Sequence, residues 1–356
     1  MIAKIMEKQR IVITQDLESQ LQQEIVCCNH DRLFVLTDEN TQKYCWPLLA
    51  GYRIFSSAEV ITIPASDSNK TLESVGHVWS ELQRRGATRH SLLINLGGGM
   101  VTDLGGFAAS TFKRGIAFIN IPTTLLAMVD ASVGGKTGFN FGGLKNEIGV
   151  FRNANSVIIC TAFLQTMDQG NLYSGYAEML KHALLSNINM WAAHLDFEPD
   201  TTAQALLQLQ DMVADSIKVK EKIVEEDPTE KGIRKALNLG HTIGHAFESL
   251  ALRREPVLHG YAVAWGMVCE LYLSTIKTGF PIARMRKTVR YIFEHYGRMP
   301  ITCDDYPELL ELMQHDKKNV AGKINFTLLS DVGGILINQT ATQNEIEEAL
   351  DFYREG

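Results

Sequence analysis

Three histidines and one glutamate in this chain have the types and spacing that suit metal binding. His241 and His245 are four residues apart, so on a helix they lie on one face. His259 follows downstream, and Glu178 lies upstream. One carboxylate and two imidazoles with an open position are the ligands of a catalytic divalent metal ion. The spacing leaves open whether both His241 and His245 bind the ion, and no glutamate stands between them as in the zinc-protease motif.

A glycine-rich turn in the first half of the chain suits a dinucleotide. Gly97, Gly98 and Gly99 follow an apolar run and precede a helix predicted over residues 100–109. Bare backbone N–H groups at the start of a helix can bind a pyrophosphate, although a tight structural turn explains the glycines as well. Asp38, at the end of an earlier apolar run, could hold a ribose diol. Here the acid precedes the glycines in the sequence, whereas in the usual Rossmann motif the glycines come first.

A third candidate is the segment 130–146, which is polar, rich in glycine and carries Lys136 and Lys145. A loop of this kind can bring cations and amides to an anion, and a solvated turn is the alternative. Its stretch Gly-Gly-Lys-Thr resembles a P-loop, but that motif needs glycine at position 130, where this chain has Asp130. We therefore exclude a nucleoside-triphosphate site. A metal ion beside a nicotinamide would indicate chemistry on an alcohol or a ketone.

Short apolar runs in the first half predict the elements that must position these residues. The runs occupy residues 33–37, 60–63, 92–96, 117–121 and 157–160. Continuous apolar runs indicate parallel strands covered on both faces, and helical patterns between them indicate βαβ units. We expect a Rossmann-like α/β dinucleotide-binding domain over residues 1–160.

The second half has a different texture, with long segments rich in Leu, Met, Ala and Glu. Helices are predicted over residues 203–224, 240–252, 261–278 and 308–315, and one β-like piece over residues 324–329. Gly240 and Gly244 repeat at the spacing of the two histidines, which lets another backbone approach that helix. We expect a mainly α-helical metal- and substrate-binding domain over residues 161–356.

Composition narrows the classes of partner. The 356 residues carry a formal net charge of -7, which disfavours nucleic acid, and no stretch approaches the roughly 20 apolar residues that span a membrane. The six cysteines are scattered without metal-binding spacing, so they are expected to be reduced thiols. The first residues contain no secretory apolar region. These features favour a cytoplasmic protein.

Taken together, the motifs resemble one family, the 3-dehydroquinate synthases, within the sugar-phosphate cyclases. The matching segments follow in the same order and spacing over roughly residues 33–335: 97–106, 112–115, 122–125, 130–146, 174–181, 232–234, 237–248 and 316–319. The resemblance implies an NAD- and metal-dependent lyase that acts as a homodimer on a phosphosugar. It does not distinguish Zn²⁺ from Co²⁺ as the metal ion.

The resemblance also implies a role for individual residues. The implied metal ligands are Glu178, His241 and His259. The residues implied to line the NAD site are Asp38, Asp67, Lys70, Gly98, Gly99, Met100, Asp103, Thr123, Thr124, Lys136 and Lys145. Those implied to bind the substrate phosphate are Lys136, Asn146, Asn238 and His245, with Lys317 or Lys318 completing the pocket. Lys220 and Arg234 would face the carboxylate, and Asp130 and Lys181 the ring hydroxyls. Arg114 matches a residue that family members lend to the neighbouring subunit.

The implied reaction converts 3-deoxy-D-arabino-heptulosonate 7-phosphate into 3-dehydroquinate and phosphate, a step of the shikimate pathway to aromatic amino acids. It runs through transient oxidation by NAD, phosphate elimination, re-reduction and an intramolecular aldol closure. The catalytic residues implied are Asp130, Lys136, Lys181 and His245. Asp67 stands where a longer acid is usual, and residues 166–171 depart from the family pattern, so no cofactor role is carried onto that segment.

Three other functions compete with this one. A related cyclase that makes an aminocyclitol precursor or a valiolone would act on a substrate without a carboxylate, and would have no use for Lys220 and Arg234. A metal-dependent polyol dehydrogenase would reduce NAD in net terms and would not need the cationic pocket. A non-catalytic phosphosugar-binding protein would not need the metal ligands.

Overall fold

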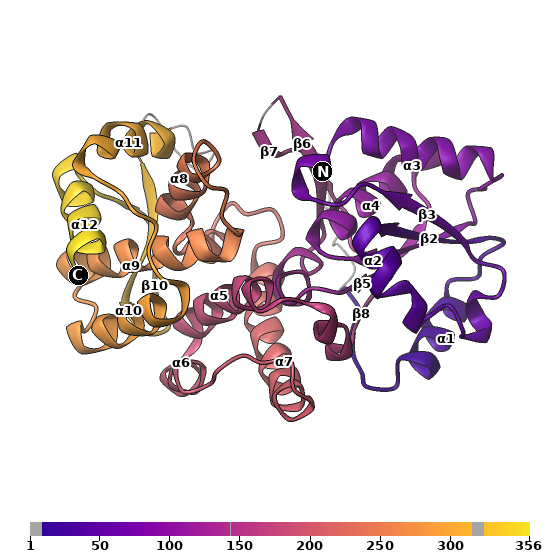
Figure 1. Ribbon diagram of the computed structural model, residues 1–356, viewed down its shortest axis with the longest axis horizontal. Helices are drawn as coiled ribbons and strands as arrows, with labels where there is room; N and C mark the ends of the chain where they lie inside the picture. Colours follow the sequence, from indigo (N-terminus) through magenta and orange to yellow (C-terminus); the bar gives the residue numbers. More distant parts are fainter. Residues whose placement is uncertain (1–8, 143, 315–323) are drawn as a thin grey trace. The chain divides into compact units, whose positions relative to one another are not determined.

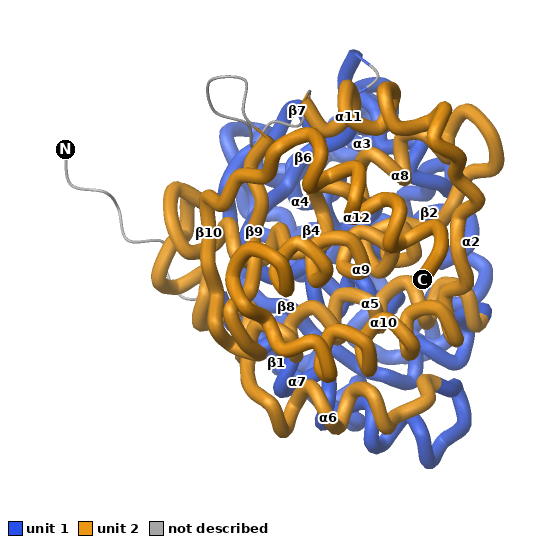
Figure 2. Tube along the Cα trace, turned by 90° about the vertical axis from the view of Figure 1, so that its left-hand side faces the viewer, with its two compact units in different colours: residues 1–168, 200–217 blue, residues 169–199, 218–356 orange. Residues whose placement is uncertain are grey.

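The computed structural model describes residues 9–142, 144–314 and 324–356, and the chain divides into two compact units (Figure 2). Unit 1 comprises residues 1–168 and 200–217, and unit 2 comprises residues 169–199 and 218–356. The sequence predicts one boundary near residue 160. The structure divides the chain slightly later, and returns 200–217, the first part of helix α7 (Ala203–Glu226), to unit 1.

A six-stranded sheet forms the centre of unit 1, and β2, β3, β5 and β8 are labelled in Figure 1. The strand order is β1-β8-β5-β4-β2-β3. Every neighbouring pair in it is parallel. The strands are β1 (Ile11–Ile13), β2 (Leu33–Asp38), β3 (Glu59–Ile63), β4 (Leu92–Gly97), β5 (Ala117–Pro122) and β8 (Ser156–Ile159). The five apolar runs therefore are strands as predicted, and β2, β4 and β8 are buried along their whole length.

Helices connect these strands. They are α1 (Leu17–Cys27), α2 (Glu39–Tyr44), α3 (Leu72–Arg84) and α4 (Gly99–Thr111). Short 3-10 turns lie at Trp46–Leu48, Arg53–Phe55, Asp67–Asn69, Phe112–Arg114 and Thr161–Thr166, and a π-helical turn lies at Ala127–Ala131. Helix α4 packs on β4 and β5 and also contacts α3. Parallel strands need such covering because both faces of the sheet are apolar.

The strand order creates a switch point between β2 and β4. After β2 the chain passes to β3 on one side, and the following strands β4, β5 and β8 continue on the other side. In open α/β sheets, ligands bind outside the carboxyl ends of the strands at such a point. Asp38, the last residue of β2, and Gly98, directly after β4, flank this crevice.

The segment 130–146, expected to be a loop, is largely β-structure, so that expectation is wrong. Strands β6 (Lys136–Phe141) and β7 (Leu144–Phe151) form an antiparallel hairpin in which Lys136 pairs with Phe151. Gly138 and Gly149 face each other so closely that a Cβ on Gly138 would meet the backbone carbonyl of Ile148. Gly138 therefore serves strand pairing, whereas Gly134, Gly135 and Gly142 have the positive φ of turn residues.

Unit 2 is mainly helical. Its helices are α5 (Gln169–Ser186), α6 (Ile188–Leu195), the end of α7, α8 (His241–Ala251), α9 (His259–Thr278), α10 (Ile282–Tyr296), α11 (Tyr306–Gln314) and α12 (Gln343–Glu355). Short 3-10 turns lie at Ile233–Asn238 and Cys303–Asp305. Strands β9 (Asn325–Asp331) and β10 (Gly334–Thr340) form an antiparallel hairpin, of which the sequence analysis had foreseen only the first strand.

Helix α9 runs through the centre of unit 2 and packs on α5, α8, α10, α12 and β9. Its contact with α8 depends on glycine. A Cβ on Gly244 would lie 2.8 Å from the carbonyl oxygen of Ala262, and one on Gly266 would meet the carbonyl oxygen of Gly240. The prediction that Gly240 and Gly244 admit another backbone is confirmed.

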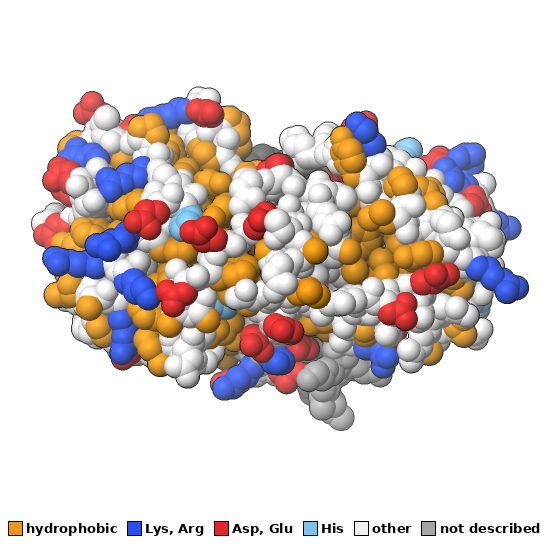
Figure 3. Space-filling model, turned by 60° about the horizontal axis from the view of Figure 1, so that its bottom comes forward, with side chains coloured by type: hydrophobic (Ala, Val, Ile, Leu, Met, Phe, Trp, Pro, Cys, Tyr) orange, Lys and Arg blue, Asp and Glu red, His pale blue; other side chains and the backbone are white. Residues whose placement is uncertain are grey.

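The charge pattern of the surface and the apolar character of the helices can be compared with what nucleic-acid binding and membrane insertion require. On the face drawn in Figure 3, acidic and basic side chains are interspersed, and neither sign forms a continuous stripe. Among the described residues, no helix combines the length and the apolar character needed to cross a bilayer.

Candidate functional site

Three helices of unit 2 bring the predicted metal ligands together. Glu178 lies in α5, His241 begins α8 and His259 begins α9. The Oε1 atom of Glu178 lies 3.4 Å from Nε2 of His241 and 3.7 Å from Nε2 of His259. Three potential ligand atoms from distant parts of the sequence thus point at one small volume.

The second nitrogen of each imidazole is held by a hydrogen-bond partner. Nδ1 of His241 lies 3.1 Å from the carbonyl oxygen of Leu239, and Nδ1 of His259 lies 3.3 Å from Oε2 of Glu248. An acceptor at Nδ1 fixes the tautomer that leaves Nε2 as the ligand atom. Both rings therefore present the nitrogen that faces Glu178.

The buried carboxylate of Glu178 provides the test of whether a metal ion fits. Glu178 is completely buried, and its Oε1 atom has no hydrogen-bond partner among the described residues. Ligands arranged tetrahedrally at about 2.1 Å from an ion lie about 3.4 Å apart, which agrees with the distance between Glu178 and His241. Burying a charged carboxylate oxygen without a hydrogen-bond donor costs free energy unless a cation binds it. The residues fit a divalent ion.

His245 lies in the same cluster. One ring nitrogen of each of His241, His245 and His259 falls within 4.8 Å of the others. The ring centroids of His241 and His245 are 5.3 Å apart, which follows from their positions one turn apart on α8. The geometry therefore admits His245 either as a ligand or as a neighbour of the ligands.

Cationic side chains are buried in unit 2. Lys181 is 1% exposed and contacts Oε2 of Glu178, one turn away on α5. Lys220 is 5% exposed and Arg234 is 2% exposed. Nη1 of Arg234 donates to the carbonyl oxygen of Pro228 at 2.7 Å. Three buried cationic side chains thus lie in unit 2, where they concentrate positive charge in a chain whose formal net charge is -7.

The loop before Arg234 is organised by Asp227. Its carboxylate accepts backbone hydrogen bonds from Lys231 at 3.0 Å, Gly232 at 2.6 Å and Arg234 at 3.1 Å. Partial desolvation raises the pKa of Asp227, but the three backbone donors outweigh it and hold the pKa below its ordinary value. A charged carboxylate therefore fixes the backbone that carries Arg234.

Two residues that the sequence analysis had not assigned belong to this region. Glu248 contacts His259, and its position seven residues after His241 places it on the same helical face, a spacing that could have identified it. Glu230 accepts a hydrogen bond from Nδ2 of Asn238 at 3.2 Å. Its backbone is left-handed, with φ of 60°, a conformation that non-glycine residues seldom adopt. No sequence signal predicted that conformation.

In unit 1, the residues expected to line the NAD site lie after the carboxyl ends of four neighbouring strands. Asp38 ends β2, Asp67 and Lys70 follow β3, the glycines follow β4, and Thr123 and Thr124 follow β5. Asp38 also caps α2, since its Oδ1 accepts from the backbone N–H of Thr41 at 2.7 Å. The structure gathers these residues at one edge of the sheet.

The start of α4 provides the test of whether a dinucleotide fits. Gly98 occupies the N-cap position without a side-chain cap, and Gly98, Gly99 and Met100 are partly exposed. A Cβ on Gly98 would lie 3.1 Å from Cγ2 of Thr124, and one on Gly99 would lie 3.1 Å from Cβ of Ala131. A side chain at either position would thus crowd its neighbours, where the first N–H groups of a 13-residue helix open to solvent. Those groups fit a pyrophosphate.

Polar contacts link the other expected residues of unit 1. Nζ of Lys70, which is 3% exposed, lies 2.5 Å from Oδ2 of Asp103 and 2.5 Å from Oδ1 of Asn146. Lys145 pairs with Asp67 at 3.4 Å, and both side chains are about half exposed. Lys136 is exposed at the start of β6, and Asp130 is half-buried in the π-helical turn.

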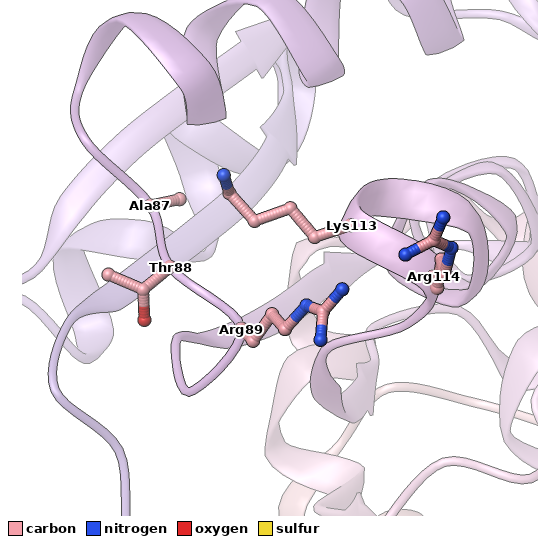
Figure 4. Close-up of a pocket in the computed structure, with 5 residues that line it drawn as sticks. All are labelled: Ala87, Thr88, Arg89, Lys113 and Arg114. Carbon is pink, nitrogen blue, oxygen red and sulfur yellow. The ribbon is translucent and has the colours of Figure 1, made fainter.

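Arg114 lies at the other edge of the sheet. It lines a pocket of about 360 Å³ with Ala87, Thr88, Arg89 and Lys113 (Figure 4). These residues precede β4 and β5, so they lie at the amino ends of the strands, away from the expected cofactor residues. The backbone of Arg114 is left-handed, with φ of 69°. Within unit 1, Arg114 thus lies at the opposite edge of the sheet from the residues expected to line the NAD site. Lys317 and Lys318 lie outside the described residues.

Two family models match adjacent parts of this chain. The model of the 3-dehydroquinate synthase N-terminal part matches residues 60–174, and that of the C-terminal part matches residues 175–319. The curated 3-dehydroquinate synthase of Parabacteroides distasonis is 53% identical over 352 residues, which cover 99% of each chain. That of Pyrococcus abyssi is 40% identical over 277 residues, 78% of this chain and 80% of its own.

Solved structures show the same fold. A 2-epi-5-epi-valiolone synthase from Streptomyces hygroscopicus subsp. jinggangensis, with NAD⁺ and Zn²⁺ bound, is 26% identical, with a TM-score of 0.83 over 98% of this chain and 97% of its own. A 2-deoxy-scyllo-inosose synthase complexed with carbaglucose-6-phosphate, NAD⁺ and Co²⁺ is 23% identical, with a TM-score of 0.83 over 99% of both chains. Since both family models match in sequence and the identity to a curated relative extends over nearly the whole chain, this chain belongs to the 3-dehydroquinate synthase family.

Proposed function

We propose that this chain converts 3-deoxy-D-arabino-heptulosonate 7-phosphate into 3-dehydroquinate and inorganic phosphate, with NAD and a divalent metal ion. The family supplies the reaction. The observation that supports the chemistry in this chain is the buried Oε1 of Glu178, which faces Nε2 of both His241 and His259. NAD, when bound, would supply reversible hydride transfer at C5 of the substrate. A bound divalent ion would act as a Lewis acid toward the oxygen of the C5 alcohol.

Glu178, His241 and His259 are the proposed metal ligands. Lys181 contacts the carboxylate of Glu178 and is proposed to donate a hydrogen bond to a ring hydroxyl of the substrate. Asp130 is proposed to accept one from another hydroxyl. Groups held in fixed rotamers lose little freedom on binding, so they orient the sugar at low entropic cost.

The substrate carboxylate is assigned to Lys220 and Arg234. Both cations are buried, which strengthens their interaction with an anion because little water screens it. The planar guanidinium of Arg234 matches a carboxylate, and Asp227 fixes the backbone beneath it. A cyclase substrate without a carboxylate would make no ion pair with either side chain.

The substrate phosphate is assigned to Lys136, Asn146, Asn238 and His245. These side chains offer cationic or amide donors to its oxygens. Elimination requires a proton to leave C6; the substrate's own phosphate is proposed to accept it, and His245 to take the proton on from there. Histidine suits this task because one imidazole nitrogen can accept a proton while the other donates one.

NAD is assigned to the edge of the sheet in unit 1. The backbone N–H groups of Gly98, Gly99 and Met100 at the start of α4 would bind the pyrophosphate. Asp38 would bind a ribose through the carboxylate oxygen that is not used in capping α2. The remaining side chains assigned to this site are Asp67, Lys70, Asp103, Thr123, Thr124, Lys136 and Lys145.

We also propose that the chain acts as a homodimer to which Arg114 contributes across the interface. The support is that Arg114 lies in unit 1 at the edge of the sheet opposite the expected cofactor residues. Arg114→Ala and Glu178→Gln should each be inactive alone. Mixed after reversible dissociation, they should recover about a quarter of the wild-type activity, because a mixed dimer keeps one complete site. No recovery in demonstrated mixed dimers would contradict the contribution.

The six cysteines, all unpaired in the structure, favour a reducing compartment, and we propose the cytoplasm.

The reaction is tested with purified, metal-loaded protein, the heptulosonate phosphate and a trace of NAD. Phosphate release and nicotinamide absorbance are followed together. We expect many phosphates released per NAD without accumulated NADH, since the hydride is returned. Steady NADH formation without phosphate would instead identify a dehydrogenase. Turnover of a phosphosugar without a carboxylate, in preference to the heptulosonate, would identify another cyclase of the same fold.

A further inference from the structure

Helices α8 and α9, whose first residues are His241 and His259, exchange carboxylates. Glu270 of α9 binds the first turn of α8, and Glu248 of α8 binds the first residue of α9. Each helix thus supplies an acid to the end of the other that carries a proposed metal ligand. Neither acid is among the proposed ligands.

Glu270 takes the place of an N-cap for α8. Helix α8 has no side-chain cap, because its N-cap residue is Gly240 in a left-handed conformation with φ of 79°. The carboxylate of Glu270 accepts from the backbone N–H groups of Gly240 at 2.6 Å, Thr242 at 3.0 Å and Ile243 at 3.3 Å. Glu270 is completely buried, so these bonds replace water at the helix terminus that bears His241.

Glu248 acts on the other ligand. Its Oε2 lies 3.3 Å from Nδ1 of His259, and its side chain is 8% exposed. A carboxylate at Nδ1 fixes the ring orientation and raises the basicity of the nitrogen that binds metal. Because Glu248 lies two turns beyond His241 on α8, the position of His259 is tied to the helix that carries His241.

We infer that Glu248 and Glu270 are positioning residues that set the distance and orientation between His241 and His259. This inference rests on the proposed metal site. The glycine contacts between α8 and α9 already bring the two backbones together without either acid. The two carboxylates therefore fix what this backbone contact does not. Glu248 limits the rotation of the imidazole of His259, and Glu270 holds the first turn of α8.

The test measures Co²⁺ binding to metal-stripped protein by visible absorption and by competition with a chelator. Glu248→Gln keeps the volume and one acceptor atom but removes the charge. We expect Co²⁺ affinity to fall about 10- to 100-fold and the visible bands to shift, while the melting temperature of the metal-free protein stays unchanged. The exposed Glu18→Gln in α1 is the matched control and should bind Co²⁺ as wild type does.

Glu270→Gln should weaken Co²⁺ binding and also lower the melting temperature of the metal-free protein, since an amide nitrogen would face backbone N–H groups. Unchanged Co²⁺ affinity and spectrum in Glu248→Gln would overturn its positioning role. If Glu270→Gln lowered the melting temperature but bound Co²⁺ with wild-type affinity at temperatures where the variant is folded, Glu270 would be purely structural. That result would overturn its positioning role. His259→Ala separates the two proposals: if it binds Co²⁺ normally, the metal site itself is wrong.

Discussion

The two units position their functional residues in opposite ways. In unit 1, the expected cofactor residues lie in loops after parallel strands, and the central feature is bare backbone at Gly98 and Gly99. In unit 2, the proposed ligands are side chains on packed helices, and Glu178 is completely buried. The expected cofactor site in unit 1 depends on exposed backbone, whereas the proposed metal site in unit 2 depends on buried charged side chains.

This difference determines how each site should respond to mutation. A backbone site tolerates many changes in neighbouring side chains but not an added side chain in the cradle. A buried charge site is sensitive to every change of charge, because an uncompensated charge in the interior is costly. Unit 2 should therefore show the larger effects of single substitutions.

The largest effect is expected from the ligands. Glu178→Gln and His259→Ala should each lose the bound metal and lower turnover by about a thousandfold or more, because the ion contributes several kcal/mol to the transition state. Metal content by elemental analysis, turnover and circular dichroism check this together. A folded variant with normal metal content and normal turnover would remove its residue from the ligand set.

The next effect addresses the backbone site. Gly98→Val should weaken NAD binding about tenfold, because the side chain would approach Thr124 and obstruct the backbone N–H groups. Calorimetric titration with NAD measures it, and Co²⁺ affinity should not change. Gly51→Val is the matched control, since a Cβ there meets nothing within 4 Å. Equal NAD affinity in wild type and Gly98→Val would show that the dinucleotide does not use this turn.

A third prediction concerns recognition of the substrate carboxylate. Lys220→Ala should raise the KM for the heptulosonate phosphate about 10- to 100-fold and leave NAD affinity unchanged, since a hydrogen bond to a charged group is worth about 1.5–3 kcal/mol. Lys218→Ala, an exposed lysine in the same helix, serves as control. If direct titrations showed that Lys220→Ala weakens NAD as much as substrate, the assignment would be wrong.

The smallest effect concerns pH. Because the pKa of Asp227 is lower in the folded protein, its stabilising contribution is complete above the ordinary value of 3.8 and is lost as the pH falls through the folded value. Asp227→Asn should lower the free energy of unfolding by about 0.5–1 kcal/mol at pH 6, and the difference from wild type should be smaller at pH 3, below the ordinary value. Urea unfolding at both pH values measures it. A difference that persists unchanged at low pH would show that the charge of Asp227 is not the cause.

Local sequence patterns predicted much of the fold. The five apolar runs became strands because a parallel sheet buries both faces, which requires continuous apolar residues. The periodic segments became α7, α8 and α11 because an amphipathic helix has to bury one face, whereas the more uniformly apolar α9 is buried along most of its length. The glycine-dense segment 130–146 was misjudged because glycine density marks turns and close strand pairs alike.

The sequence by itself determined which chemical groups are present. The pair His241 and His245, the acid Glu178 and the bare turn at Gly98 follow from residue types and local spacing. Only the tertiary structure decided which groups meet. It placed Asp38 and Gly98 on either side of a switch point, paired Lys145 with Asp67, and brought Glu248 and Glu270 to the helices they hold. These contacts join residues far apart in the chain, and local spacing carries no information about a distance that packing alone sets.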